Sequence, residues 1–191
     1  DPTFHAFIRA AIATSPLVVP DVAVTRVKTS KDGCKPMPTV PDNSVAKVNV
    51  TVLNKGNFTE TFAVTLYANS TVVETQTVTG LASGTQTVVH YRWNTTGWAH
   101  GNYTISAYAG PVSGDINPAD NSYTDGIIKV VIPGDINGSG TVDIYDAIIL
   151  ANAYQTTPGN PRWNPNSDLK ADDVIDIYDA IILANHYNQH E

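Results

Sequence analysis

Two hydrophobic periods divide this sequence of 191 residues. Between residues 21 and 132, apolar and polar residues alternate, the pattern of strands with one buried face. The clearest apolar positions of these runs are Val48, Val50 and Val52; Phe62, Val64 and Leu66; Val89, Tyr91 and Trp93; and Tyr103, Ile105 and Ala107. Turn-forming residues separate the runs. About seven short strands over roughly 110 residues predict an antiparallel β-sandwich of immunoglobulin type.

The first 20 residues follow a different pattern. Phe4, Phe7 and Ile8 recur at helical spacing, and an extended Ser-Pro-Leu-Val-Val-Pro segment that includes Val18 follows them. This segment is too short for a domain, and we interpret residues 1–20 as an apolar arm. The arm either binds a neighbouring subunit, folds back on its own chain, or is a remnant of a removed leader.

A near-exact repeat dominates the C-terminal region, residues 133–191. Residues 143–154 (DIYDAIILANAY) recur at 176–187 (DIYDAIILANHY) with an offset of 33 and one mismatch, Ala153 against His186. An acidic loop precedes each copy. The repeat predicts a small α-helical domain built from two EF-hand-like loop-helix units.

The first acidic loop has the spacing of a calcium loop. Oxygen ligands at positions 1, 3, 5, 9 and 12, with a backbone carbonyl at position 7, surround a hard cation, and a glycine at position 6 allows the sharp turn. Gly140 occupies position 6. The predicted ligands are Asp135, Asn137, Ser139, the Thr141 carbonyl, Asp143 and Asp146.

The second loop departs from this pattern twice. Lys170 stands at position 3 and Asp173 at position 6, although Asp tolerates a left-handed turn better than most residues. The remaining predicted ligands are Asp168, Asp172, the Val174 carbonyl, Asp176 and Asp179. We expect one strong calcium site. The second is weaker or degenerate: either it binds calcium more weakly, or the Lys170 ammonium group partly replaces the ion. We also expect Val142 to pair with Ile175 as a short strand between the loops.

Charge is distributed unevenly along the chain. The net charge is −7, and residues 133–191 carry nine acidic side chains against only Arg162 and Lys170. The rest of the chain is balanced. There is no basic face for nucleic acid and no apolar run long enough to span a bilayer, whereas a local acidic excess favours metal cations.

Residues 21–132 resemble a known family of modules. The segments VNVTVLNKGN (48–57), WNTTG (93–97) and GNYTI (101–105) are similar to the CARDB module, a cell-adhesion-related domain of prokaryotic surface proteins. The resemblance implies an immunoglobulin-like spacer or adhesion domain without catalysis.

Residues 133–191 resemble a type I dockerin domain, because the duplicated loop, the Asp at position 12 and the repeat spacing coincide. The resemblance implies calcium-dependent docking onto a cohesin-type β-sandwich. It places recognition at Ile144, Tyr145, Ile177 and Tyr178, with 151–152 and 184–185 further along the helices, and the near-identical halves would permit two binding orientations. The alternative is that these Ile-Tyr pairs are buried within the chain.

A cluster of glycosylation sequons indicates an exported protein. Five N-glycosylation sequons crowd into the predicted sandwich, at Asn49, Asn57, Asn69, Asn94 and Asn102. Strand alternation and turn residues place all five facing solvent, so the sandwich is expected to display glycans. Asn137 also begins a formal sequon, but we expect it to be unmodified because it is a predicted calcium ligand. A single cysteine, Cys34, excludes an internal disulfide.

No catalytic pattern is present. The five histidines lack zinc-site spacing, and there is no nucleophile elbow or nucleotide loop. The group Asp115, Asn117, Asp120, Asn121 and Asp125 is compatible with a further calcium site, but hydrogen-bonded turns explain it better. We therefore expect a non-catalytic extracellular assembly protein, the subunit of a head-to-tail surface assembly or filament. The alternative is a cell-surface accessory protein whose dockerin binds a cohesin on another protein.

Overall fold

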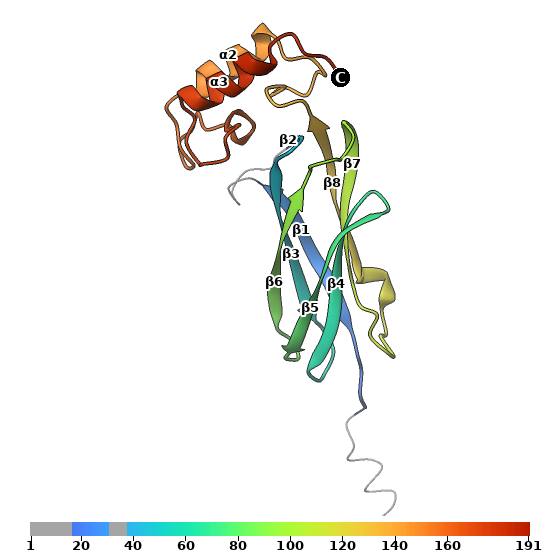
Figure 1. The fold of residues 1–191 in the computed structure, drawn as a ribbon. Coiled ribbons are helices and arrows are strands. Elements are labelled where there is room, and N and C mark those ends of the chain that lie inside the picture. Colours follow the sequence, from blue (N-terminus) through green and yellow to red (C-terminus); the bar gives the residue numbers. More distant parts are fainter. Residues whose placement is uncertain (1–16, 31–37) are drawn as a thin grey trace, which may run out of the picture.

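The computed structural model describes residues 17–30 and 38–191, and the chain is mainly β. Figure 1 shows an elongated two-layer sandwich with a helical unit at one end and the beginning of β1 at the other. The strands are β1 Val22–Ser30, β2 Thr39–Pro41, β3 Val45–Asn54, β4 Glu60–Ala68, β5 Thr71–Leu81, β6 Gln86–Asn94, β7 Gly101–Ala109 and β8 Ser122–Val131. The helices are η1 Pro118–Asp120, α2 Ile144–Ala153, η2 Pro165–Ser167 and α3 Ile177–His186. The arm residues Phe4, Phe7 and Ile8, and also Cys34, lie outside the described residues.

The two layers are a three-stranded sheet, β1-β3-β6, and a five-stranded sheet, β2-β8-β7-β4-β5. The predicted fold class, a β-sandwich followed by a small helical domain, is confirmed. One pairing departs from the antiparallel rule, because β2 runs parallel to β8 from Thr39 to Pro41. This short strand lies at the edge of the sheet. An edge strand tolerates Pro41, because proline has no backbone N–H to donate to a further strand.

The core of the sandwich lies between the sheets and follows the predicted alternation. Val48, Val50 and Val52 on β3 are fully buried, as are Val64 and Leu66 on β4. Trp93 is 1% exposed, and its ring meets those of Trp98 and Tyr103 edge-on at 5.3 and 5.7 Å between centroids. Aromatic side chains therefore fill the end of the core nearest the helical unit.

A second, smaller core holds the C-terminal unit together. It consists of buried side chains from both repeats and from the segment between them, namely Ile132, Ile136, Val142, Leu150, Ala153, Trp163, Ile175 and Leu183. Each helix begins with a capping box. The side chain of Asp143 or Asp176 accepts a hydrogen bond from the helix backbone, and the side chain of Asp146 or Asp179 accepts one from the backbone N–H of that cap residue. The repeat in the sequence is therefore a repeat in structure.

Candidate calcium loops and docking surface

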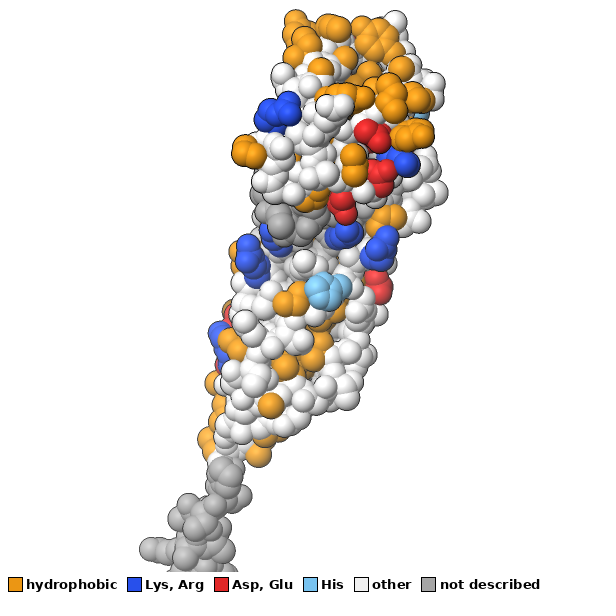
Figure 2. Space-filling model, turned by 90° about the vertical axis from the view of Figure 1, so that its left-hand side faces the viewer, with side chains coloured by type: hydrophobic (Ala, Val, Ile, Leu, Met, Phe, Trp, Pro, Cys, Tyr) orange, Lys and Arg blue, Asp and Glu red, His pale blue; other side chains and the backbone are white. Residues whose placement is uncertain are grey.

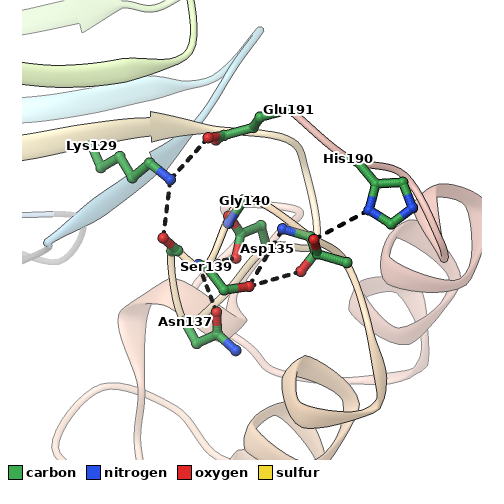
Figure 3. Close-up of polar contacts among 9 residues, drawn as sticks. Lys129, Asp135, Asn137, Ser139, Gly140, His190 and Glu191 are labelled. Carbon is green, nitrogen blue, oxygen red and sulfur yellow. Dashed lines mark hydrogen bonds and ion pairs between the residues drawn. The ribbon is translucent and has the colours of Figure 1, made fainter.

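The side chains of the first loop are organised around Asp135 and Asp146, which are 1% and 0% exposed. Asp135 accepts hydrogen bonds from Ser139 N at 2.9 Å and from Gly140 N at 2.9 Å. Asn137 Oδ1 accepts a second bond from Ser139 N at 2.8 Å. Figure 3 shows these side chains close together inside the loop. Carboxylate, amide and hydroxyl oxygens thus converge on one turn.

Asp146 closes the loop from its far side. Its Oδ1 accepts hydrogen bonds from Ile136 N at 2.8 Å and Asn137 N at 3.0 Å, and its Oδ2 accepts one from Asp143 N at 3.0 Å. The sharp turn at Gly140 has φ 89°, a conformation that glycine adopts without strain. Position 12 therefore orients the start of the loop and the start of α2 together.

The electrostatics of the first loop suit a divalent cation. Burial raises the pKa of Asp135, against hydrogen bonds from Gly140 and Ser139 that lower it, and the nearby Asp146 carboxylate raises it again. The ionised loop is therefore costly without a counter-charge. A hard cation with six to eight oxygen ligands, as calcium takes, fits this all-oxygen set.

The second loop has the same backbone plan. Asp168 and Asp179 are both fully buried, and Asp168 accepts hydrogen bonds from Asp172 N at 3.2 Å and Asp173 N at 3.3 Å. Asp179 Oδ1 accepts a bond from Lys170 N at 2.9 Å. Asp173 takes φ 65° at the position of Gly140, so an aspartate keeps the left-handed turn.

A protein cation already occupies part of the second loop. Lys170 Nζ lies 2.9 Å from Asp172 Oδ2 and 4.4 Å from the centre of the Tyr178 ring. The hydrogen bond from Lys170 lowers the pKa of Asp172. Position 3 thus supplies a positive charge and no oxygen ligand, so this donor set fits calcium less well than that of the first loop.

The backbones of the two loops do not pair with each other, which corrects the expected strand pairing of Val142 with Ile175, although both side chains belong to the same small core. Val142 N donates to Gln189 O at 3.0 Å and Val142 O accepts from Asn188 N at 2.9 Å. Ile175 N donates to Thr156 O at 3.0 Å, and Ile175 O accepts from Gln155 N at 2.8 Å. Each loop therefore pairs with the segment that follows the helix of the other repeat, because those segments turn back at Gln155 and Asn188, which both have positive φ.

The predicted recognition residues are exposed. Ile144 and Tyr145 are 55% and 66% exposed, and their counterparts Ile177 and Tyr178 are 54% and 55% exposed. Figure 2 shows hydrophobic side chains gathered over the helical end of the molecule. The interpretation in which these pairs are buried within the chain therefore fails for the described residues.

The exposed apolar surface also includes residues that the sequence analysis did not assign to recognition. Ile148 and Ile181, one turn after Ile144 and Ile177, are 50% and 47% exposed. Their position four residues later in a helical repeat was a signal available in the sequence. Between the helices lies a 380 Å³ groove lined by Ala147, Leu150, Ala151, Tyr154, Ala180 and Leu183.

The first loop also contacts the sandwich, a feature without a sequence signal. Lys129 of β8 donates from Nζ to Gly138 O at 3.0 Å and forms an ion pair with Glu191 at 2.9 Å. His190 Nδ1 lies 3.2 Å from Thr141 Oγ1 (Figure 3). One lysine thus joins the sandwich, the first loop and the residues that pair with it.

The five sandwich sequons occupy different environments. Asn57, Asn69, Asn94 and Asn102 are exposed, and Asn49 is half-buried beside His90 on the neighbouring strand. The Asn57 side chain bonds the backbone of Leu17 and Val19.

Among residues 17–30 and 38–191, no three His, Cys, Asp or Glu side chains already stand together as a metal-binding group. The ligand sets predicted for the two loops also include amide, hydroxyl and carbonyl oxygens.

Comparison with known families agrees with this architecture. The CARDB family model matches residues 20–118, more than half of the chain, and the model of the dockerin type I domain matches residues 133–188. The chain belongs to the CARDB family, and a type I dockerin domain follows its CARDB domain. Both domains are non-catalytic interaction modules, type I dockerins bind calcium, and dockerins bind cohesins.

Solved structures include similar CARDB domains. One, from Pyrococcus furiosus, is described as a complex with di-metal ions; it is 25% identical with a TM-score of 0.47, covering 62% of this chain and 99% of that one. A domain of a Methanosarcina acetivorans cell surface protein is 28% identical with a TM-score of 0.46, covering 59% and 93%. A β-glucosidase from Erythrobacter marinus is 17% identical with a TM-score of 0.44, covering 59% of this chain and 16% of the enzyme.

No curated protein sequence matches the chain. Dockerins are typical of extracellular or cell-surface proteins. Within the described residues, every helix is too short or too polar to cross a membrane.

Proposed function

We propose that this chain is an extracellular adaptor whose dockerin, residues 133–191, binds a cohesin-type β-sandwich of another protein in a calcium-dependent manner. The observation that carries the proposal is the exposure of Ile144, Tyr145, Ile177 and Tyr178, two identical apolar pairs at corresponding helix starts. Large apolar side chains exposed in a repeated pattern are typical of interaction surfaces.

Calcium acts as a structural cofactor in this proposal. The first loop would hold the ion through Asp135, Asn137, Ser139, Thr141, Asp143 and Asp146, and the second would bind it weakly or be held by Lys170. Each helix start that carries a recognition pair is capped by the last ligands of its loop. Loss of the ion would therefore misplace the docking residues as well as destabilise the domain.

The test uses purified type I cohesin domains as probes. Binding of the full chain is measured by calorimetry in calcium and again after chelation, with a double variant, Tyr145→Ala and Tyr178→Ala, and with Tyr123→Ala as a matched control. Tyr123 is 40% exposed on β8 of the sandwich and lies outside the repeat. Binding that survives both chelation and the double substitution would contradict the proposal.

The sandwich, residues 21–132, is proposed to act as a spacer that displays glycans. Four of its five sequons are exposed, which supports modification at Asn57, Asn69, Asn94 and Asn102, with Asn49 as a fifth acceptor. Mass spectrometry of the native protein should find hexose-containing peptides at these positions. Finding all five unmodified would refute this role.

Head-to-tail assembly is a second candidate function. The two ends of the molecule differ: Leu17 and Val18 are 80% and 63% exposed at the beginning of the described chain, and the apolar helical surface lies at the opposite end (Figure 1). Contacts between unlike ends generate open fibres unless their rotation closes. Sedimentation of the full chain in calcium at increasing concentration should show growing species, and a chain that begins at residue 21 should not. A full chain that stays monomeric removes this candidate.

A further inference from the structure

Three connections of the sandwich meet at the end that lies away from the dockerin (Figure 1). They are the entry into β1, the turn between β3 and β4, and the β7–β8 connection that contains η1. The backbone N–H groups of Lys55 and Gly56 donate to Asp21 O at 2.8 and 3.0 Å, and Ile116 N donates to Pro20 O at 3.1 Å. Residues far apart in sequence are therefore fixed side by side.

Acidic and amide side chains are concentrated at this junction and are largely buried. Asp21 and Glu60 are each 9% exposed, and Asn121 is 2% exposed. Asp115 accepts hydrogen bonds at Oδ2 from Asn121 Nδ2 at 3.0 Å and from Val22 N at 3.4 Å. Asp120 belongs to the same group, because its Oδ2 accepts a bond from Lys55 Nζ at 2.5 Å.

Four oxygens of this group have no hydrogen-bond donor. They are Asp21 Oδ1, Glu60 Oε1, Asp120 Oδ1 and Asn121 Oδ1, all shielded from solvent. Burying a polar oxygen without a donor costs about 1–3 kcal/mol, and more if the group is charged. Three of them belong to Asp21, Asp120 and Asn121, which interact directly or through Asp115, so one bound cation would partner all three.

The protein supplies too little positive charge for this group. Lys55 is its one ion-pair partner among the described residues, and that contact uses the other oxygen of Asp120. Burial raises the pKa of Asp21, and Asp120 and Asp115 raise it further; burial and Asp115 also raise the pKa of Glu60. These carboxylates therefore repel one another across a shared region.

We propose that this junction is a cation site, separate from the dockerin loops, in which Asp21, Asp120 and Asn121 direct their unpartnered oxygens at a calcium ion. Asp115 holds Asn121 in place, and Glu60 adds negative charge. An all-oxygen donor set without histidine or cysteine selects a hard cation. Since no three acids of the described residues form a metal-binding group, Asn121 has to complete the site, and the carboxylates of Asp21 and Asp120 have to move closer together when the ion binds.

This set differs from the acidic group recognised in the sequence. Asp125 belongs elsewhere, since its Oδ2 accepts a hydrogen bond from Thr29 N at 2.9 Å. Asn117 N donates to Asp115 Oδ1 at 2.9 Å, so that part is the expected turn. Asp21 and Glu60, distant in sequence, supply the buried oxygens that a turn alone does not explain.

Bound calcium would tie the chain entry at Asp21 to the η1 connection at Asp120 and Asn121. The sandwich would then be stiffened where β1 begins, and the extracellular calcium level would control this stiffness. Extracellular calcium modules bind in the range of about 10⁻⁴–10⁻³ M, which suits a site with only a few carboxylates.

The test is a calcium titration of the full, ¹⁵N-labelled chain after chelation, followed by NMR. The backbone amides of Val22 and Asn117 and the side-chain amide of Asn121 should shift and saturate at millimolar calcium. Resonances of the dockerin loops report separately, so failure of the proposed docking function and failure of this site are distinguishable. If these three groups do not shift while the loop resonances do, the junction is no calcium site.

Variants sharpen the assignment. Asp21→Asn and Asp120→Asn should abolish the shifts at the junction and leave those of the first dockerin loop intact. Glu74→Gln removes an equal charge from β5 of the same sandwich and should leave both sets intact. Junction shifts that persist in both Asp variants would overturn the proposal. The wild-type titration decides the question even if a variant does not fold.

Discussion

The two acidic loops of the dockerin share a backbone plan but differ in chemistry. In both, the carboxylates at positions 1 and 12 are buried and accept backbone N–H groups, so Asp135 matches Asp168 and Asp146 matches Asp179. They differ at position 3, where Asn137 supplies an oxygen and Lys170 a cation. Positions 1 and 12 thus maintain the fold of a loop. Its charge balance is set at positions 3, 5 and 6, where Lys170, Asp172 and Asp173 of the second loop stand in place of Asn137, Ser139 and Gly140.

The largest expected effect is loss of the first site. Asp135→Ala should abolish high-affinity calcium binding and lower the melting temperature of the dockerin as strongly as chelation does. Calcium at about a thousand times its dissociation constant contributes about 4 kcal/mol of folding free energy, which this variant forgoes. Calorimetry in calcium and in chelator measures both quantities.

Asp168→Ala is the matched control, because it removes the corresponding carboxylate from the second loop. It should leave the strong binding event in place. Equal losses in the two variants would mean that the loops do not differ in the way described.

The next effect concerns the two recognition surfaces. If cohesin binds in either of two orientations, Tyr145→Ala or Tyr178→Ala alone should weaken binding only about twofold, since the other orientation remains. Combining both should cost at least about 2 kcal/mol, or about thirtyfold, as expected for an aromatic hot spot. Cohesin calorimetry checks the ratio. A single variant as weak as the double would assign the whole interface to one helix.

A third experiment converts the second loop towards the first. Lys170→Asn restores an oxygen at position 3 and removes the ion pair with Asp172, so a second equivalent of calcium should bind more tightly. Lys170→Met serves as the control, because it removes the charge without adding a ligand. If Lys170→Met gains as much affinity, the charge of Lys170 rather than the missing oxygen weakens the loop.

The smallest effect is a difference in pH response. Burial raises the pKa of Asp135, so as pH falls this carboxylate takes up a proton early and calcium affinity of the first loop declines. In the metal-free chain the same protonation relieves the cost of a buried charge, so it does not destabilise the fold. The hydrogen bond from Lys170 lowers the pKa of Asp172 in the folded chain. The pair therefore stabilises the fold fully at any pH above the pKa of Asp172 in the unfolded chain, and this stabilisation is lost as pH falls through the lowered pKa. Carboxylate NMR titrations of both residues measure this order, and a reversed order would contradict the comparison.

Much of the fold was predictable because burial on one face leaves a period in the sequence. The runs on β3, β4 and β6 alternate strictly, and each is buried as expected. The three-residue β2 has no period to detect, and the Thr-rich β5 is mostly exposed, so it carries little hydrophobic signal.

The sequence predicted the ligand residues of the site but not their long-range contacts. Ligand spacing within a loop is local, so Asp135 to Asp146 could be assigned from the sequence. Exposure of Ile144 and Tyr145 was not decidable there, because α2 is apolar on more than one face. Pairing of Val142 with Gln189 and the contact of Lys129 with Gly138 depend on how distant segments fold together, and no local pattern encodes them.

The Lys129 contact has a mechanical consequence. Tension applied between a docked partner and the sandwich would enter the dockerin along β8, which leads into the first loop almost directly through Pro133. Lys129 Nζ ties that same loop, through Gly138 O and Glu191, back to the strand that pulls on it. We therefore expect the connection between the two domains to resist reorientation under load. Calcium in the first loop should raise the force needed to unfold the dockerin.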